Sequence, residues 1–162
     1  MKITFIQTGG TIDKEYPKTT RGYAFEIGEP AVKRILEKIN PVFEYKIITL
    51  LKKDSLDIID KDREKIMQAC KDNKNDKIVI THGTDTMIDT AKKLSKIKDK
   101  TIVITGAMRP EKFSDSDAMF NTGAAIISAE ILPYGIYITM NGRVYKWNKI
   151  KRNMKTGQFI EI

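Results

Sequence analysis

Hydrophobic residues occur along this chain in short continuous runs, separated by longer stretches in which apolar and polar positions alternate with a helical period. The runs are rich in β-branched and aromatic residues. Near-continuous apolar strands of this kind are typical of a parallel sheet that is buried on both faces. We therefore predict that the strands of such a sheet span residues 3–7, 43–50, 77–81, 101–105 and 134–140.

The stretches between these runs predict helices. Apolar residues in 32–39 follow the i, i+3, i+4, i+7 rule, and Pro30 suits the first turn. Two further amphipathic helices are expected over 61–71 and 86–98, and segment 116–131 is apolar on most sides, which predicts a more deeply buried helix. Alternating strands and helices predict the α/β class: a single three-layer, doubly wound domain over residues 1–162 with a mainly parallel, Rossmann-like or flavodoxin-like sheet.

The predicted strands end in polar, glycine-containing loops. TGGT (8–11), HGTDT (82–86) and GAMRP (106–110) each follow a strand directly. In an open parallel sheet the loops at the carboxyl ends of the strands line the ligand crevice, and glycines there let the backbone approach a ligand closely. Gly and Thr are common at any strand end, but three such loops at one edge predict a binding crevice.

A long segment from Asp13 to about Gly28 has no clear helix or strand period and contains Tyr16 and Tyr23. Loops longer than about 12–15 residues in a compact domain are usually functional or disordered. One interpretation is a lid that carries a tyrosine to the crevice, and the other is a loose connection. Composition alone does not separate them.

Composition excludes several classes of protein. Lys and Arg exceed Asp and Glu by 29 to 21, a net charge of +8, which fits either a nucleic-acid surface or a lysine-rich solvated surface. No nucleic-acid-binding motif is present, so we favour the second and do not expect nucleic acid as a partner. No apolar stretch approaches the ~20 residues that span a membrane, and the N-terminus lacks the features of a signal peptide. The single cysteine predicts a reducing cytoplasm.

The single histidine, His82, excludes His-rich metal sites and argues against a Ser-His-Asp hydrolase. Thr11 is a candidate nucleophile because a Gly-Gly turn can hold its hydroxyl in the crevice. His82 could be its base, but a packed, hydrogen-bonded histidine at a strand end is the more common case. Thr84 and Asp85 offer a second hydroxyl beside a carboxylate, although Asp85 could instead cap the following helix. These residues predict a metal-free hydrolytic or binding crevice and leave the substrate open.

Six motifs give the chain a family resemblance along essentially its whole length. They are TGGTID (8–13), DSLDI (54–58), THGTDTM (81–87), TGAMRP (105–110), SDSDAMFN (114–121) and MNGRVY (140–145). In this order and spacing they resemble the L-asparaginase family of the threonine-nucleophile type, in a short form that corresponds to the N-terminal domain only. The resemblance implies hydrolysis of L-asparagine to L-aspartate and ammonia through a threonine acyl-enzyme, with no metal or cofactor.

The resemblance also assigns site residues. It makes Thr11 the nucleophile, Tyr16 (or, less well matched, Tyr23) the lid tyrosine, and Thr84 and Asp85 members of a Thr-Lys-Asp triad. Asp54 and Ser55 match residues that bind the substrate. Of the two, Ser55 matches the residue that binds the α-carboxylate. Asp85 matches the acceptor of the α-ammonium group. Gly10, Gly83 and Ala107 match the residues whose backbone forms the close walls of the family's substrate site.

One position departs from the family pattern. Where the family has the triad lysine in a V-x-K-N pattern, this chain has Ile150-Lys151-Arg152-Asn153, which places Arg152 at the lysine position. Arginine stays charged and cannot act as a base. Either Lys151 reaches the site, or Arg152 gives electrostatic support only, or activity is weak or lost. A glutaminase, another ω-amide hydrolase and a non-catalytic asparagine or aspartate binder therefore remain alternatives. The resemblance further implies a homodimer or a dimer of dimers.

Overall fold

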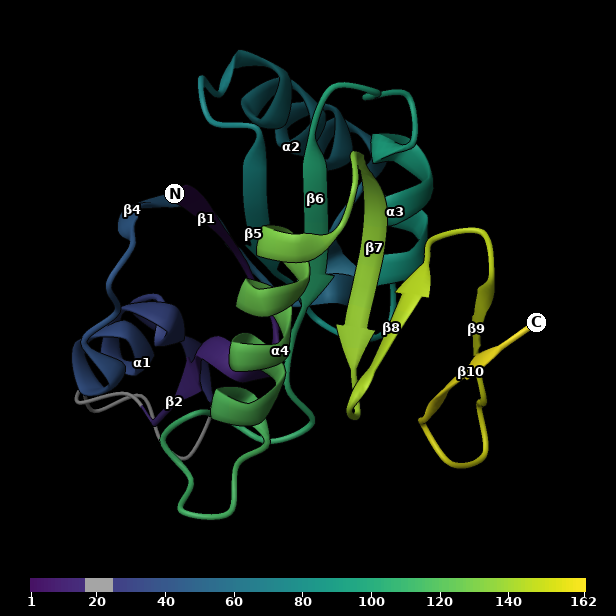
Figure 1. Ribbon diagram of the computed structural model, residues 1–162. Helices are drawn as coiled ribbons and strands as arrows, with labels where there is room; N and C mark the ends of the chain where they lie inside the picture. The colour runs from purple at the N-terminus through teal and green to yellow at the C-terminus, as the bar shows by residue number, and fades with distance from the viewer. Residues whose placement is uncertain (17–24) are drawn as a thin grey trace.

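A computed structural model describes residues 1–16 and 25–162 and contains a central six-stranded sheet (Figure 1). Its strand order is β4-β1-β5-β6-β7-β8. The first five strands in this order are parallel, and β8 is antiparallel to β7. The strands are β1 (Lys2–Gly9), β4 (Glu44–Lys53), β5 (Lys77–Thr81), β6 (Thr101–Thr105), β7 (Gly135–Met140) and β8 (Arg143–Lys146).

Helices cover both faces of the sheet, which confirms the predicted three-layer architecture. Helices α1 (Ala31–Ile39) and α4 (Ala118–Ile131) pack on one face, and α2 (Asp60–Asp72) and α3 (Met87–Leu94) pack on the other (Figure 1). Side chains alternate between the two faces along each strand. In β5, Ile78 and Ile80 join the core beneath α2 and α3, whereas Val79 joins the core beneath α1 and α4.

The helix predictions hold, with shifted boundaries and one correction. Pro30 lies just before α1, and α3 ends at Leu94, four residues earlier than predicted, although Ile97 is still buried. The prediction that segment 116–131 is deeply buried is wrong for one side of α4, because only one side of the helix reaches the sheet. The other side is apolar but exposed, at Met119, Phe120, Ile127 and Ile131.

The C-terminal part of the chain contains elements that the hydrophobic pattern did not predict. Asn141 and Gly142 both have positive φ and form the turn between β7 and β8. A hairpin of β9 (Ile150–Arg152) and β10 (Phe159–Glu161) follows. It is held against the sheet by a hydrogen bond from Tyr145 Oη to the Phe159 carbonyl. Its strands are too short to show a period.

Strand order determines where a ligand site can form. Taken in chain order, the parallel strands lie in the sequence 2-1-3-4-5, the flavodoxin-like arrangement, and the direction of connection reverses between β1 and β5. Ligands of open α/β sheets bind at such a switch point, beyond the carboxyl ends of the strands. Here the loops that follow β1 and β5 are TGGT and HGTDT. None of the helices in the described part of the chain has the length and apolar character to cross a bilayer.

Candidate functional site

The turn after β1 presents Thr11 at the edge of the sheet. Gly9 and Gly10 have φ of 112° and 86°, values that only glycine adopts readily. The Gly10 amide donates to the Lys53 carbonyl at 2.9 Å, which ties the turn to the end of β4. A 3₁₀ turn (Thr11–Asp13) follows immediately. The glycine pair thus ends β1 and leaves Thr11 half-exposed in the crevice.

Close backbone packing brings three loops together at this edge. A Cβ on Gly10 would overlap the backbone of Gly83, and a Cβ on Gly83 would lie 2.6 Å from Ser55 Cβ. Ser55 Oγ accepts a hydrogen bond from the Asp85 amide at 3.3 Å. Glycine is therefore required at two of these positions for the Thr11, Ser55 and Asp85 loops to meet.

These loops enclose a hollow of about 260 Å³. Its volume is just below the ~300–1,000 Å³ of pockets for drug-sized ligands, so it suits a metabolite of amino-acid size. Its lining residues are Thr11, Lys14, Asp54, Ser55, Leu56, Asp57, Gly83 and Asp85.

Charged side chains in and beside the hollow are arranged as ion pairs. Lys14 Nζ lies 2.7 Å from Asp54 Oδ2, and this hydrogen bond holds the pKa of Asp54 below its usual value. Asp54 Oδ1 also accepts from the Leu56 amide and caps the turn that carries Ser55. Asp85 forms an ion pair with Arg152 and keeps 42% of its side chain exposed. Asp85 therefore does not cap α3, whose N-cap is Thr86.

The β9–β10 hairpin delivers Arg152 to the site. Ile150 is buried, and Arg152, two residues later on β9, shares its face and reaches Asp85. Arg152 Nε also donates to the Gly157 carbonyl at 3.3 Å. Lys151 lies between them, exposed, on the opposite face of a strand with period two. The structure thus brings Arg152 to Asp85.

Other predicted site residues lie around the hollow but not on its surface. Thr84 is buried beside Gly83, and Ala107 is buried in a small apolar cluster with Ile12 and Ala118. Tyr16 is 56% exposed and stacks on Phe25 at 4.5 Å between ring centroids. Tyr23 lies outside the described residues.

His82 is a structural residue, as the more common case predicts. Its ring is fully buried, with Nδ1 2.8 Å from the Gly83 carbonyl and Nε2 2.8 Å from Thr90 Oγ1. The carbonyl requires the proton on Nδ1, so Nε2 accepts from the Thr90 hydroxyl. Burial lowers the pKa of His82 to about 4. The neutral ring fixes the loop after β5.

Asp13 is the second buried titratable group near Thr11. Its Oδ1 accepts from the Ala31 amide at 2.7 Å, at the start of α1. Within the described part of the chain, Asp13 Oδ2 and Gln7 Oε1 are both buried without a hydrogen-bond partner. Burial raises the pKa of Asp13 to about 7. Gln7 and Arg34 act to lower this pKa, but burial outweighs them.

Sequence reasoning missed four residues of this region. Lys14, Leu56 and Asp57 line the hollow. Leu56 and Asp57 lie within the DSLDI motif, and Lys14 meets Asp54 only because β1 and β4 are neighbouring strands. Asp117 accepts from the Met108 and Arg109 amides and thereby anchors the GAMRP loop. Among the described residues, no three His, Cys, Asp or Glu side chains are grouped to hold a metal ion.

Comparisons with known proteins match nearly the whole of this chain. A family model described as "Asparaginase, N-terminal" matches residues 2–159. L-asparaginase 2 of Escherichia coli is 31% identical over 169 residues, which cover 95% of this chain and 47% of that protein. Glutaminase-asparaginase of Acinetobacter glutaminasificans is 27% identical over 172 residues, which cover 98% of this chain and 52% of that protein. The thermostable L-asparaginase from Thermococcus kodakarensis matches with a TM-score of 0.84 at 26% identity, over 100% of this chain and 51% of that one. This chain spans about half the length of the curated relatives it matches.

Proposed function

Because this chain belongs to the asparaginase family, we propose that it hydrolyses L-asparagine to L-aspartate and ammonia through an acyl-enzyme on Thr11. The observation that carries the proposal is the meeting of Thr11, Ser55 and Asp85 around one hollow at the switch point of the sheet. A hydroxyl, a second hydroxyl and a carboxylate within one site of this size can bind a small zwitterion and attack its side-chain amide.

The reaction proceeds by acyl transfer in two halves. Thr11 Oγ forms a bond to the side-chain amide carbon, its proton passes to the leaving nitrogen, and ammonia departs as the C–N bond breaks. Water then adds to the resulting ester, the C–Oγ bond breaks, and aspartate leaves with Thr11 restored. Neither half requires a metal or an organic cofactor, because every proton and electron pair is supplied by substrate, water and side chains.

Thr84 and Asp85 assist the proton transfers in this proposal, and Arg152 replaces the lysine of the family pattern. Because arginine does not act as a base, Arg152 holds Asp85 in place and contributes positive charge without transferring a proton. Its ion pair with Asp85 and the opposite orientation of Lys151 favour Arg152 over Lys151 in this role.

Substrate binding uses the same loops. Ser55 Oγ binds the α-carboxylate, and the exposed part of the Asp85 carboxylate binds the α-ammonium. Asp54 acts indirectly, because it binds Lys14 and caps the turn that carries Ser55. Gly83 forms part of the wall of the hollow, and Gly10 packs directly against it, whereas Ala107 is buried away from the hollow. Tyr16 would have to leave its stack on Phe25 to reach Thr11.

Glutamine is the second candidate substrate. The observation that favours it is the likeness to glutaminase-asparaginase of Acinetobacter glutaminasificans over 98% of this chain. We further propose that the protein acts in the cytoplasm, in line with its single cysteine, and that it self-associates as a homodimer or a dimer of dimers. The exposed apolar side of α4 supports self-association, because a helix that is apolar all round is normally covered.

The direct test is ammonia release from L-asparagine and L-glutamine by the wild type, Thr11→Ala and the surface control Thr49→Ala. We expect turnover by the wild type and the control, and a loss of at least ~10³-fold in Thr11→Ala. Turnover of glutamine alone would support the second candidate. Absence of turnover, with thermal stability still raised by asparagine or aspartate, would identify a binder instead.

A further inference from the structure

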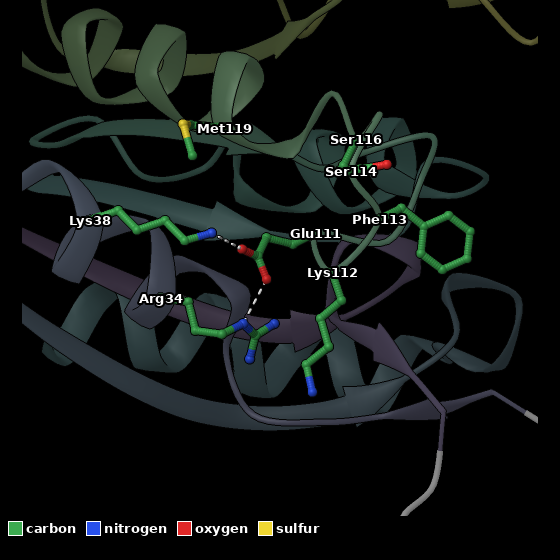
Figure 2. Close-up of a pocket in the computed structure, with 8 residues that line it drawn as sticks. All are labelled: Arg34, Lys38, Glu111, Lys112, Phe113, Ser114, Ser116 and Met119. Atoms are coloured by element: carbon green, nitrogen blue, oxygen red, sulfur yellow. Dashed lines mark hydrogen bonds and ion pairs between the residues drawn. The ribbon is translucent and has the colours of Figure 1, made fainter.

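A second cavity, of about 620 Å³, lies between α1, the loop before α4 and the first turn of α4 (Figure 2). It shares no lining residue with the hollow at Thr11. We call it the α1–α4 cavity. Its lining residues are Arg34, Lys38, Glu111, Lys112, Phe113, Ser114, Ser116 and Met119.

One buried carboxylate organises the charges in this cavity. Arg34 Nε lies 2.6 Å from Glu111 Oε2, and Lys38 Nζ, one helical turn further along α1, lies 3.2 Å from Oε1 (Figure 2). Burial acts to raise the pKa of Glu111, but the hydrogen bonds from both cations outweigh it and keep the pKa below its usual value. Glu111 is therefore ionised, and two positive charges share its single negative charge.

The cavity keeps unused capacity for an anion. Lys112 adds a third cation to the lining and forms an ion pair with Glu15. Arg34 Nη2 is buried and has no hydrogen-bond partner among the described residues. A buried donor without a partner is destabilising, so the guanidinium fork is one acceptor short.

We propose that the α1–α4 cavity binds a phosphate group, either free phosphate or the phosphate of a small monoester. Arginine forks and lysines are the side chains that proteins use for phosphate. Arg34, Lys38 and Lys112 face the carboxylates of Glu111 and Glu15, which leaves a net charge of +1 for an anion to balance. Phe113 and Met119 form an apolar wall on which the organic part of a monoester can lie.

The cavity is linked to the Thr11 turn, although it is separate from the hollow. The Glu111 amide donates to the Ile12 carbonyl at 3.1 Å, and Lys112 pairs with Glu15, three residues after Ile12. A phosphate that draws Lys112 away from Glu15 would act directly on the backbone next to the 3₁₀ turn. The proposal concerns binding and stands whether or not the chain hydrolyses asparagine.

The test is calorimetric titration with inorganic phosphate at constant ionic strength, so that the general attraction of a +8 chain for anions is equally screened in every titration. The variants are Lys38→Gln, which leaves Glu111 paired with Arg34, and Arg34→Lys, which keeps the positive charge but removes the guanidinium fork, so that the fold is kept. The matched control is Lys33→Gln, an exposed lysine on the same helix. Phenyl phosphate serves as a second probe for the monoester source.

We expect saturable binding of one phosphate by the wild type and Lys33→Gln, at least fivefold weaker in Lys38→Gln and Arg34→Lys (~1 kcal/mol). Tighter binding of phenyl phosphate than of phosphate would indicate a monoester, and equal binding would indicate free phosphate. The proposal is overturned if the wild type gives no saturable heat with either probe. It is also overturned if Lys33→Gln weakens binding as much as Lys38→Gln, since the effect would then come from net charge alone.

Discussion

At the scale of single residues, two charged or titratable side chains near Thr11 lead to separate predictions. Asp13 is buried two residues after Thr11, with its pKa raised by burial to about 7, which makes the Thr11 turn sensitive to pH. Arg152 forms an ion pair with Asp85 and occupies the lysine position of the family pattern.

Asp13 leads to a prediction about stability. The folded state binds the Asp13 proton more tightly than the unfolded chain, whose pKa is near 3.8, so its contribution is complete below about pH 4 and is lost as pH rises toward 7. The loss amounts to ~4 kcal/mol. Asp13→Asn keeps an acceptor for the Ala31 amide and does not titrate. Chemical denaturation should find the stability of the variant, relative to that of the wild type, greater at pH 8 than at pH 5, and the same difference at both values would contradict this prediction.

Arg152 leads to a prediction about catalysis. Arg152→Ala removes the partner of Asp85, and we expect kcat/KM for ammonia release to fall by ~10²-fold. Lys151→Ala is the matched control, because it removes the neighbouring charge on the opposite face of β9, and it should change kcat/KM by less than about twofold. A larger loss in Lys151→Ala than in Arg152→Ala would assign the role to the lysine.

At the scale of elements, the site depends on glycines that let loops touch. Gly83 lies between the backbone of Gly10 and the Ser55 side chain, and its own Cβ position is occupied by Ser55. The contact joins the ends of β1 and β5 to the turn after β4. A shift of any one of these loops therefore separates Thr11 from Ser55.

Gly83→Ala should destabilise the protein by about 1–3 kcal/mol and lower turnover, because the new methyl group overpacks this contact. Gly123→Ala is the control and should stabilise the protein, because its Cβ would meet nothing within 4 Å and alanine is a better helix former than glycine inside α4. Urea denaturation of both variants measures the difference. Equal stability of Gly83→Ala and the wild type would mean that the loops are not in close contact.

The strands, the layers and the loops of the hollow were predictable because hydrophobic runs and the residues that end them are local signals. The partners of Asp85 and Asp54 were not, because they arise from contacts between distant elements. Arg152 reaches Asp85 through a hairpin of two three-residue strands, and Lys14 reaches Asp54 across β1 and β4. The exposed side of α4 was misjudged because composition reports how apolar a helix is, not which of its sides finds a partner.

At the scale of the whole molecule, α4 is the element whose surroundings are incomplete. Phe120, Ile127 and Ile131 are all more than half exposed on one side of it. Contiguous apolar patches on a soluble protein usually mark an interface. Since the proposed partner is a second copy of the chain, the same face would meet itself across a twofold axis.

Ile127→Glu should therefore convert a dimer into a monomer, because two carboxylates would be buried at the centre of the contact. Light scattering coupled to size exclusion measures the mass directly. Val42→Glu, a substitution at a fully exposed apolar residue outside α4, is the control and should leave the dimer intact. A wild type that is monomeric at high concentration would remove the proposal of self-association.

The account as a whole depends on Thr11 as the nucleophile in the hollow. The most direct measurement is rapid acid quenching of the wild type during turnover of L-asparagine, followed by peptide mass spectrometry. We predict a peptide containing Thr11 that is heavier by the mass of asparagine less ammonia, and no such peptide from Thr11→Ala. An adduct on a different residue, or full turnover by Thr11→Ala, would contradict the proposed function.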